Sequence, residues 1–264
     1  MPFTGSHPAA VLPLFRLGLP SALVIGSMAP DLPYYLPIPV HSDLTHSATG
    51  IVGVDLLLGL LSFTIWGWLI EPLAVAVAPV GVRRRLPEPA PSRSWRWQPG
   101  DLRRGLVLVL SLLAGAVTHV VWDEFTHIGR FGYRHLSWLA DLHGPLAGYR
   151  WAQYGSGVFG LLVLGLAVRR WWRTAPVADP PPRAGFPRRT AFVVLASVVL
   201  ATLGGASAGL TSAVLRDQGL RRALFLIATW GGGAGLVAIL LFAGLTRLPS
   251  SSSPSAASPA PRAR

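Results

Sequence analysis

The segment Gly105–Trp122, "GLVLVLSLLAGAVTHVVW", which continues as "DEFTHIG" up to Gly129, decides the fold class of this chain. It holds no Asp, Glu, Lys or Arg, and as a helix it would be about 27 Å long, close to the thickness of a bilayer's hydrocarbon core. We therefore expect a transmembrane helix. Its end is unusual, because two histidines, an aspartate and a glutamate follow within nine positions, from His119 to His127.

The composition of the whole chain indicates an integral membrane protein. Of its 264 residues, 51% are hydrophobic and 13% are charged, against about 25% charged in soluble domains. There is no cysteine, so any metal ion would need histidine and carboxylate ligands. The net charge of +12 comes from 23 basic residues, all arginine, which gather between apolar segments. This distribution is typical of membrane topology, so we expect no nucleic-acid partner.

We predict an all-α fold, a polytopic membrane helical bundle with five spans. A further apolar segment, Ala9–Ala29, is interrupted by Pro13, Arg16 and Pro20, which predicts a broken or re-entrant N-terminal helix. The five predicted spans are Ile51–Val77, Gly105–Trp122, Trp151–Val168, Thr190–Leu210 and Ala223–Leu245.

The positions of the arginines predict the topology. Arginines are concentrated in the loop between the first and second spans and in the loop between the third and fourth, so the positive-inside rule places both loops in the cytoplasm. We expect a multi-pass protein of the plasma membrane with a cytoplasmic C-terminus. The predicted units are a membrane domain at 1–170, a cytoplasmic Pro/Arg loop at 171–189, a C-terminal helix pair at 190–246 and a disordered tail at 247–264.

This topology gathers the titratable residues at the extracytoplasmic ends of the spans or in the N-terminal segment. They are His7, His41, His46, His119, His127, His135, Asp31, Asp43, Asp123 and Glu124. His119 and Asp123 are four residues apart and so share one helix face, an arrangement that suits two metal ligands or a hydrogen-bonded helix end. Because a charge near the hydrocarbon is costly, an aspartate there needs a cation or a donor.

Two further segments supply candidate ligands. In "HSDLTHS", residues 41–47, Ser42 or Asp43 is placed to cap the following helix, and His46 would lie in its first turn. In "APD", Asp31 lies in a turn, where it either satisfies backbone amides or serves as a third ligand. Asp55 lies inside the first span, where Arg16 is a candidate partner for its carboxylate.

The stretches "MPFTGSHPAAVLPL", "GSMAPDLPYYL", "THSATG" and "THVVWDEFTHIG" resemble an uncharacterised bacterial membrane family, the domain of unknown function 4184. More distantly, the order of His7, Asp31, the "HSDLTHS" segment and the HxxxD pair resembles the predicted membrane-bound metal-dependent hydrolases. Where those carry "HRG", this chain has Ser42 and Asp43 after its histidine. The departure removes a possible phosphate-binding arginine and leaves the substrate class open.

Two functions from different classes follow. The first is a metal-dependent hydrolase of a lipid or phosphoester substrate. A divalent metal, Zn²⁺ by preference, would be held by some of His7, Asp31, His46, His119 and Asp123, and Glu124 or Asp43 would move protons. The second is a non-catalytic transporter or scaffold, in which the same cluster is structural or relays ions. The polar residues crowd one interface and do not line a path across the membrane, which speaks against a proton path.

Overall fold

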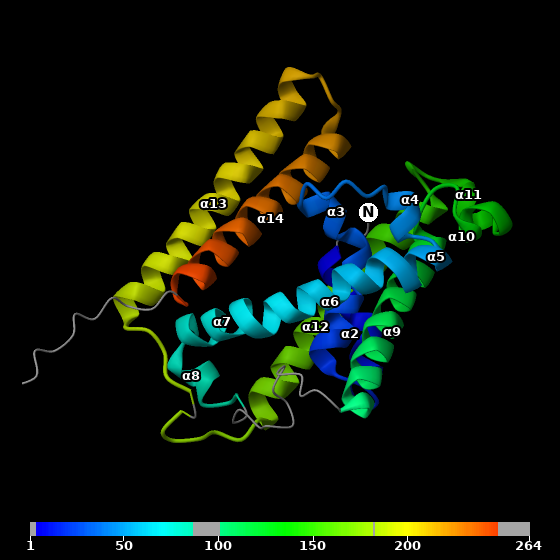
Figure 1. Ribbon diagram of the computed structural model, residues 1–264. Helices are drawn as coiled ribbons and strands as arrows, with labels where there is room; N and C mark the ends of the chain where they lie inside the picture. The colour runs from blue at the N-terminus through cyan, green and yellow to red at the C-terminus, as the bar shows by residue number, and fades with distance from the viewer. Residues whose placement is uncertain (1–3, 87–100, 182, 248–264) are drawn as a thin grey trace, which may run out of the picture.

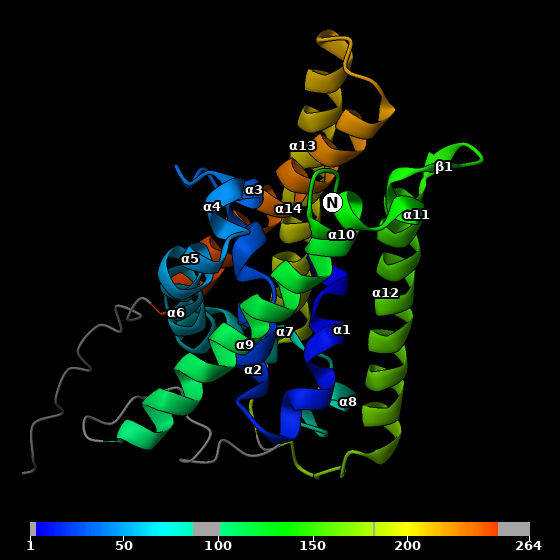
Figure 2. The same cartoon turned by 90° about the vertical axis from the view of Figure 1, so that its right-hand side faces the viewer.

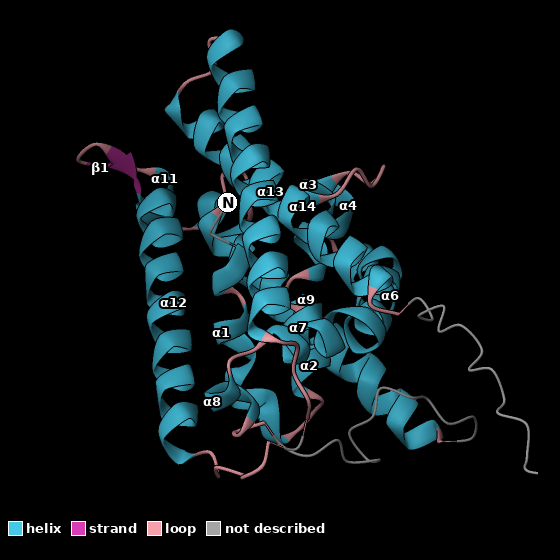
Figure 3. Ribbon diagram, turned by 90° about the vertical axis from the view of Figure 1, so that its left-hand side faces the viewer, coloured by secondary structure: helices cyan, strands magenta, loops and turns pink. Residues whose placement is uncertain are grey.

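The computed structural model describes residues 4–86, 101–181 and 183–247, and in this part of the chain helices dominate (Figure 1). The two strands of the described residues form one short antiparallel hairpin, β1 (Leu142–His143) and β2 (Leu146–Ala147), with Leu142 opposite Ala147. Figure 3 places this hairpin beyond one end of α12 (Gly148–Thr174). The all-α prediction is confirmed.

Five helices of the described chain are long and apolar enough to cross a membrane, as the sequence predicts. The first is assembled from consecutive pieces and contains two π-helical stretches, Ile51–Asp55 and Trp66–Ile70. Each span either ends at its predicted boundary or extends some residues beyond it. The pieces of the first span are α5 (Ala48–Gly50), α6 (Leu56–Ile65) and α7 (Glu71–Val77), and the later spans are α9 (Leu102–Thr126, continuing towards His135), α12, α13 (Arg188–Leu215) and α14 (Leu220–Leu245).

The N-terminal segment is broken and re-entrant. Its pieces are Thr4–Ser6, α1 (Pro8–Val11), Leu12–Arg16, α2 (Pro20–Gly26), Ala29–Asp31 and α3 (Leu32–Tyr35). The chain turns back after Arg16, where the Leu19 amide donates to Ser111 Oγ, 3.0 Å away and near the middle of α9. Figure 2 shows α1 and α2 side by side against α9. His7 and Asp31, at the two ends of this hairpin, therefore return to the same end of the bundle.

Two glycines bring α2 and α9 into backbone contact. A Cβ at Gly26 would collide with the Leu112 carbonyl, and one at Gly115 would collide with the Leu23 carbonyl and the Ser27 amide. Absence of a side chain at both positions is thus what allows the close approach. His119 lies one helical turn after Gly115, so this contact brings the end of α2 against the histidine.

Helices α13 and α14 form a packed pair that stands to one side of α9 (Figure 1). Gly205 faces the Trp230 carbonyl and Gly209 faces the Leu226 carbonyl, which confirms that small residues let these two helices approach closely. The pair contacts the remaining helices through α3 and α7.

The two ends of the bundle differ in character. Helices α4 (Ser42–Thr45), α10 (Phe131–His135) and α11 (Ser137–Ala140) lie at one end, and α8 (Val80–Arg83) lies near the other (Figure 2). Near α8 the arginine-rich loops meet, because Arg84 pairs with Asp179 at 3.0 Å and Arg183 pairs with Glu71 at 2.7 Å. Most of the predicted tail, residues 248–264, lies outside the described residues.

Candidate metal centre

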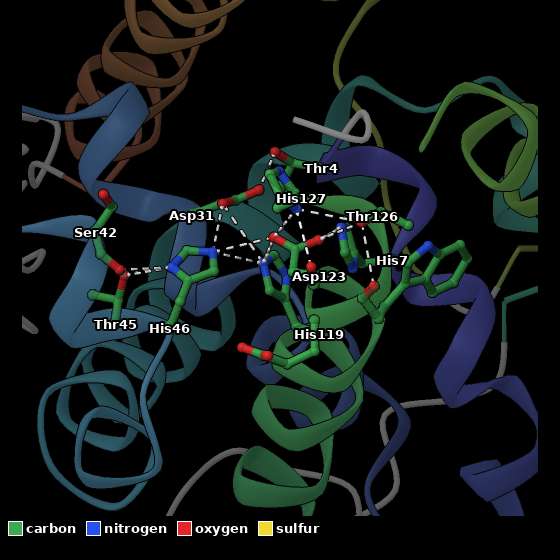
Figure 4. Close-up of polar contacts among 12 residues, drawn as sticks. Thr4, His7, Asp31, Ser42, Thr45, His46, His119, Asp123, Thr126 and His127 are labelled. Carbon is green, nitrogen blue, oxygen red and sulfur yellow. Dashed lines mark hydrogen bonds and ion pairs between the residues drawn. The ribbon is translucent and has the colours of Figure 1, made fainter. Parts of the chain in front are cut away.

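Four side chains from three separate elements converge at the end of α9. Asp31 comes from the turn after α2, His46 follows α4, and His119 and Asp123 share one face of α9. One donor atom from each lies within 4.8 Å of the others, and all four residues are buried (Figure 4). The i, i+4 pair that the sequence indicates is therefore joined by two residues far away in the chain.

Backbone carbonyls orient both histidines of this group. His46 Nδ1 lies 2.9 Å from the Ser42 carbonyl oxygen, and His119 Nδ1 lies 2.8 Å from the Ser27 carbonyl oxygen. A carbonyl can only accept, so each Nδ1 carries a hydrogen, and when the ring is neutral its Nε2 presents a lone pair to the cluster. Histidine ligands of metal ions are commonly oriented in this way.

Five of the six distances among the four donor atoms suit a metal-binding tetrahedron, and the sixth, between the two carboxylates, is within 4.8 Å. The Nε2 atoms of His46 and His119 are 3.3 Å apart, and their distances to Asp31 Oδ1 and Asp123 Oδ2 are between 3.3 and 3.6 Å. Edges of that length in a regular tetrahedron put each corner about 2.0–2.2 Å from the centre, the range of Zn–N and Zn–O bonds. The residues present thus fit a divalent cation.

The same distances are long for an ion-pair network without a metal. Charge-assisted hydrogen bonds are usually about 2.7–2.9 Å long, whereas every His–Asp contact in the group is at least 3.3 Å. The other oxygen of Asp31, Oδ2, does receive a short bond of 2.6 Å, from the Thr4 hydroxyl. Two carboxylates, two neutral imidazoles and one divalent cation also sum to zero charge, which favours burial in a membrane.

In the metal-free protein, the carboxylates hold protons on His46. Burial alone would lower the pKa of His46, but the adjacent carboxylates of Asp123 and Asp31 raise it to about 9. For Asp31 burial opposes ionisation, yet the adjacent His119 and His46 bring the pKa of that carboxyl well below its usual range. A cation that binds here must therefore displace a proton from His46.

His7 lies beside the four residues without joining their donor set. Its ring is fully buried and stacks on the His119 ring, with centroids 3.9 Å apart. Its Nε2 is 3.7 Å from Asp123 Oδ1, whereas the four-donor group uses the other oxygen of that carboxylate, Oδ2. Burial and the neighbouring His119 lower the pKa of His7 to about 4, so its imidazole is neutral.

The two predicted proton carriers are directed elsewhere. The Asp43 side chain is 97% exposed, and its recorded partner is Arg130, 3.9 Å away. Glu124 accepts from the Phe131 amide at 2.8 Å and lies 3.5 Å from Arg130. Neither carboxylate contacts the four donors in the described structure. Residue 124 is about 100° round the helix from residue 123, so Glu124 points away from the cluster. Both assignments remain predictions without geometric support.

The helix ends also differ from the prediction. Neither Ser42 nor Asp43 caps the first span; Ser47 does, accepting from the Gly50 amide at 3.0 Å. His46 precedes that cap in a non-helical position, with φ −106° and ψ 33°, and this bend turns its ring into the cluster. Ser42, Asp43 and Ser47 all lie in the same short polar segment, so the sequence alone did not indicate which of their side chains caps the helix.

Three further residues lie beside the cluster in the described structure, and of these the sequence indicates only His127. His127 Nδ1 lies 3.5 Å from Asp123 Oδ2, and Thr126 Oγ1 lies 3.5 Å from Asp123 Oδ1. Arg130 donates to the His46 carbonyl at 3.0 Å. His41 and His135 are exposed, and His143 stacks on Trp138, so these three histidines do not reach the cluster.

Asp55 lies in the first π-helical stretch, buried to 1% exposure. Within the described residues neither of its oxygens has a hydrogen-bond partner, so the expected pair with Arg16 is not formed. Arg16 is exposed at the turn of the re-entrant hairpin.

An apolar cavity of about 750 Å³, widely open to the outside, lies between α9 and α12. Trp122 and Thr126 line the cavity, and the same two residues contact the centre, since Trp122 lies against His7 and Thr126 against Asp123. Trp138 and Trp151 also line it. The cavity is therefore separated from the centre only by side chains that contact both.

The fold and the site define a multi-pass membrane protein with a buried His/Asp cluster that could hold a metal ion. The chain belongs to the family of the domain of unknown function 4184, whose model matches residues 1–244. The match covers the five spans and the whole cluster, and it confirms the nearer of the two resemblances. No curated protein and no solved structure matches the chain.

Proposed function

We propose that this protein is a metal-dependent hydrolase of the plasma membrane that cleaves a lipid-linked phosphoester at the extracytoplasmic face. The observation that carries the proposal is the convergence of four buried donors, one atom from each within 4.8 Å of the others. A divalent cation held there would need a fifth coordination position for water, and it would then lower the pKa of that water to about 7 and polarise a phosphoryl oxygen. Its preferred identity is Zn²⁺, from the mixed imidazole and carboxylate ligands.

The apolar cavity supports a lipid-like substrate. Its volume of about 750 Å³ is within the usual range of ligand sites, and its lining is largely apolar. An acyl or prenyl chain in this cavity, between Trp151 and Trp122, would bring a polar headgroup to Thr126 and Asp123. Membrane lipid is then both the surroundings and the source of the substrate.

Arg130 supports an anionic headgroup. The "HSD" segment lacks an arginine, but the structure brings Arg130 to within 3.9 Å of Asp43 and into contact with the His46 carbonyl. A guanidinium beside the centre can donate two parallel hydrogen bonds to a phosphate. Hydrolysis then forms a P–O bond to the water oxygen, breaks the P–O bond to the alcohol and transfers the water proton to that alcohol.

The alternative, a transporter, has less support from the described residues. Their buried histidine and carboxylate side chains are His7, Asp31, His46, Asp55, His119 and Asp123. Five of these six meet at one end of the bundle, and Asp55 alone lies further along a span. An ion path across the membrane would need such groups at successive depths.

The test is to purify the protein in detergent and to measure bound metal by elemental analysis, beside a double variant, His119→Ala with Asp123→Ala. We expect at least one equivalent in the wild type and in the control His135→Ala, and only traces in the double variant. Equal, substoichiometric metal in all three would contradict the proposal. The metal-loaded protein should release phosphate or a phosphorylated headgroup from phospholipid vesicles, and the double variant should not.

A further inference from the structure

The cavity between α9 and α12 has two walls of different character. Four residues of α9 that share one helix face form the first wall: Thr118, Val121, Trp122 and Phe125. Three small residues of α12, which also share a face, form the second wall: Ala152, Gly155 and Ser156. Figure 2 shows α1 between these two spans and α11 at the end of α12, and both helices add to the lining, through Ala10 and Trp138. The cavity therefore exists because α12 presents small side chains where α9 presents mostly large ones.

Trp122 forms the partition between this cavity and the metal centre. Its ring centroid lies 5.2 Å from that of His7, and its indole N–H donates to Ser156 Oγ on α12 at 2.9 Å. At the end of α9, Thr126 lines the cavity and also contacts Asp123. A ligand in the cavity would thus lie alongside the centre and approach Asp123 most closely at Thr126.

Gly155 leaves room in the cavity that helix packing does not require. Glycine is a poor helix former, and on the same helix Gly160 is explained by packing, because a Cβ there would come within 2.9 Å of the Ser6 carbonyl oxygen. A Cβ at Gly155 would meet nothing within 4 Å. Gly165 is equally unobstructed, but it does not line the cavity in the part of the chain that the structure describes. The open space at Gly155 is therefore part of the cavity.

A hydrocarbon chain is the occupant that suits this space. The cavity opens outward between two membrane spans, and its lining is largely apolar. Lipid chains are the molecules that surround these spans, and a chain gains apolar contacts there, whereas water would find few hydrogen-bond partners. Four residues beyond Thr126, Arg130 donates to the His46 carbonyl beside the centre, so a cation lies where an anionic headgroup of the same lipid would be.

We propose that Gly155 determines chain specificity: the substrate is a phosphoester lipid with one long hydrocarbon chain in this cavity, and the chain passes over Gly155, where a larger side chain would displace it. The inference rests on the proposed function and narrows its substrate to lipids whose chain reaches from Thr126 to Thr118. These two residues are eight positions apart, about 12 Å along α9. Short-chain phosphoesters are then poor substrates, because the cavity contributes little to their binding.

The first experiment compares Gly155→Leu with Gly165→Leu in the metal-loaded protein. Both changes place leucine in open space on α12 and raise helix propensity, so both variants should fold, which size-exclusion chromatography in detergent checks. The substrates are phosphoesters of one headgroup with a sixteen-carbon or a four-carbon chain. For the long chain, kcat/KM should fall at least about tenfold in Gly155→Leu, the equivalent of roughly two methylene groups displaced from an apolar site.

The long-chain kcat/KM should be unchanged in Gly165→Leu and intermediate in Gly155→Ala, which adds a single methyl group to the same space. With the four-carbon chain, all three variants should match the wild type. An equal loss in the two leucine variants, an equal loss for both chain lengths, or no loss in Gly155→Leu would overturn the role of Gly155.

The second experiment measures chain binding without hydrolysis. A phospholipid with a diazirine in its acyl chain is photolysed in vesicles that contain the protein, and labelled peptides are identified by mass spectrometry. In the wild type and in Gly165→Leu, the α9 peptide with Trp122 and Phe125 should be labelled in excess over peptides of α13, another exposed span. The excess should disappear in Gly155→Leu. No excess in the wild type, or one that persists in Gly155→Leu, would overturn the inference, whereas the expected labelling without hydrolysis of any phosphoester lipid would overturn the proposed function instead.

Discussion

The Nε2 atoms of His46 and His119 lie 3.3 Å apart, and both point away from the carbonyls that receive the Nδ1 hydrogens of their rings. Two lone pairs at this distance repel unless a proton or a cation lies between them. Removal of metal by a chelator should therefore lower the thermal unfolding temperature. A ligand present at 100 times its Kd stabilises the folded state by about 2.7 kcal/mol, so readdition of Zn²⁺ should restore the transition. Tryptophan fluorescence during heating measures it, and an unchanged midpoint would contradict a metal centre.

Thr4 tests whether a residue outside the four donors holds Asp31 in place. Its hydroxyl donates to Asp31 Oδ2 at 2.6 Å and accepts from the Tyr35 hydroxyl at 3.0 Å, which fixes the carboxylate with Oδ1 towards the centre. Loss of such an outer partner commonly weakens metal binding about 10- to 100-fold, so Thr4→Val should do the same in a chelator competition. Thr174→Val, which removes a bond to a helix carbonyl near the other end of α12, should leave the affinity unchanged.

Gly115 tests whether backbone contact positions His119. A methyl group there collides with Leu23 and Ser27, so Gly115→Ala should separate α2 from α9 and lengthen the bond from His119 to the Ser27 carbonyl. Overpacking of this kind costs about 1–3 kcal/mol, and metal affinity should fall together with the unfolding temperature. Gly165→Ala is the matched control, since nothing lies within 4 Å of its added methyl group. Equal behaviour of the two variants would argue against this role for the contact.

Arg130 tests the class of headgroup. Removal of a charge-assisted hydrogen bond to a phosphate costs about 1.5–3 kcal/mol, so Arg130→Gln should lower kcat/KM for an anionic phosphoester roughly 10- to 100-fold. Metal content should be unaffected, because the guanidinium contacts the His46 carbonyl and not the donor atoms. Arg134→Gln, an exposed change in α10, the helix that begins just after Arg130, should have no effect. A loss in Arg130→Gln that is equally large for uncharged ester lipids would indicate a structural role.

As pH rises, the folding stability of the metal-free protein should fall, whereas its affinity for metal should rise. The pKa of His46 rises from its ordinary value of 6.5 to about 9 on folding, so its proton stabilises the fold fully below pH 6.5. That stability is lost as pH rises through 9. Metal competes with this proton, so the apparent Kd for Zn²⁺ should fall about tenfold per pH unit between pH 7 and 8.5. Unfolding curves and calorimetric titrations across this range measure both, and a flat metal affinity would show that His46 does not bind the ion.

The sequence predicts what depends on local periodicity. The apolar lengths of the spans and the i, i+4 spacing of His119 and Asp123 are properties of single helices, and both are found in the structure. Which distant side chains join that pair depends on how elements pack. Asp31 and His46 reach it only because Gly26 and Gly115 allow α2 to touch α9 and because the chain bends at His46. The roles given to Glu124 and Asp43 relied on proximity along the chain, which says little about direction across a bend or around a helix.

The re-entrant hairpin has a consequence for how the protein is made. Its two ends supply His7 and Asp31, while their partners on α9 follow 88 to 116 residues later in the chain, at His119 for Asp31 and at Asp123 for His7. During synthesis the hairpin leaves the ribosome well before the helix against which it packs, and none of its pieces is long enough to be inserted as a span. His7 and Asp31 can therefore meet their partners only after α9 has been synthesised, so the centre is completed late in the folding of the chain.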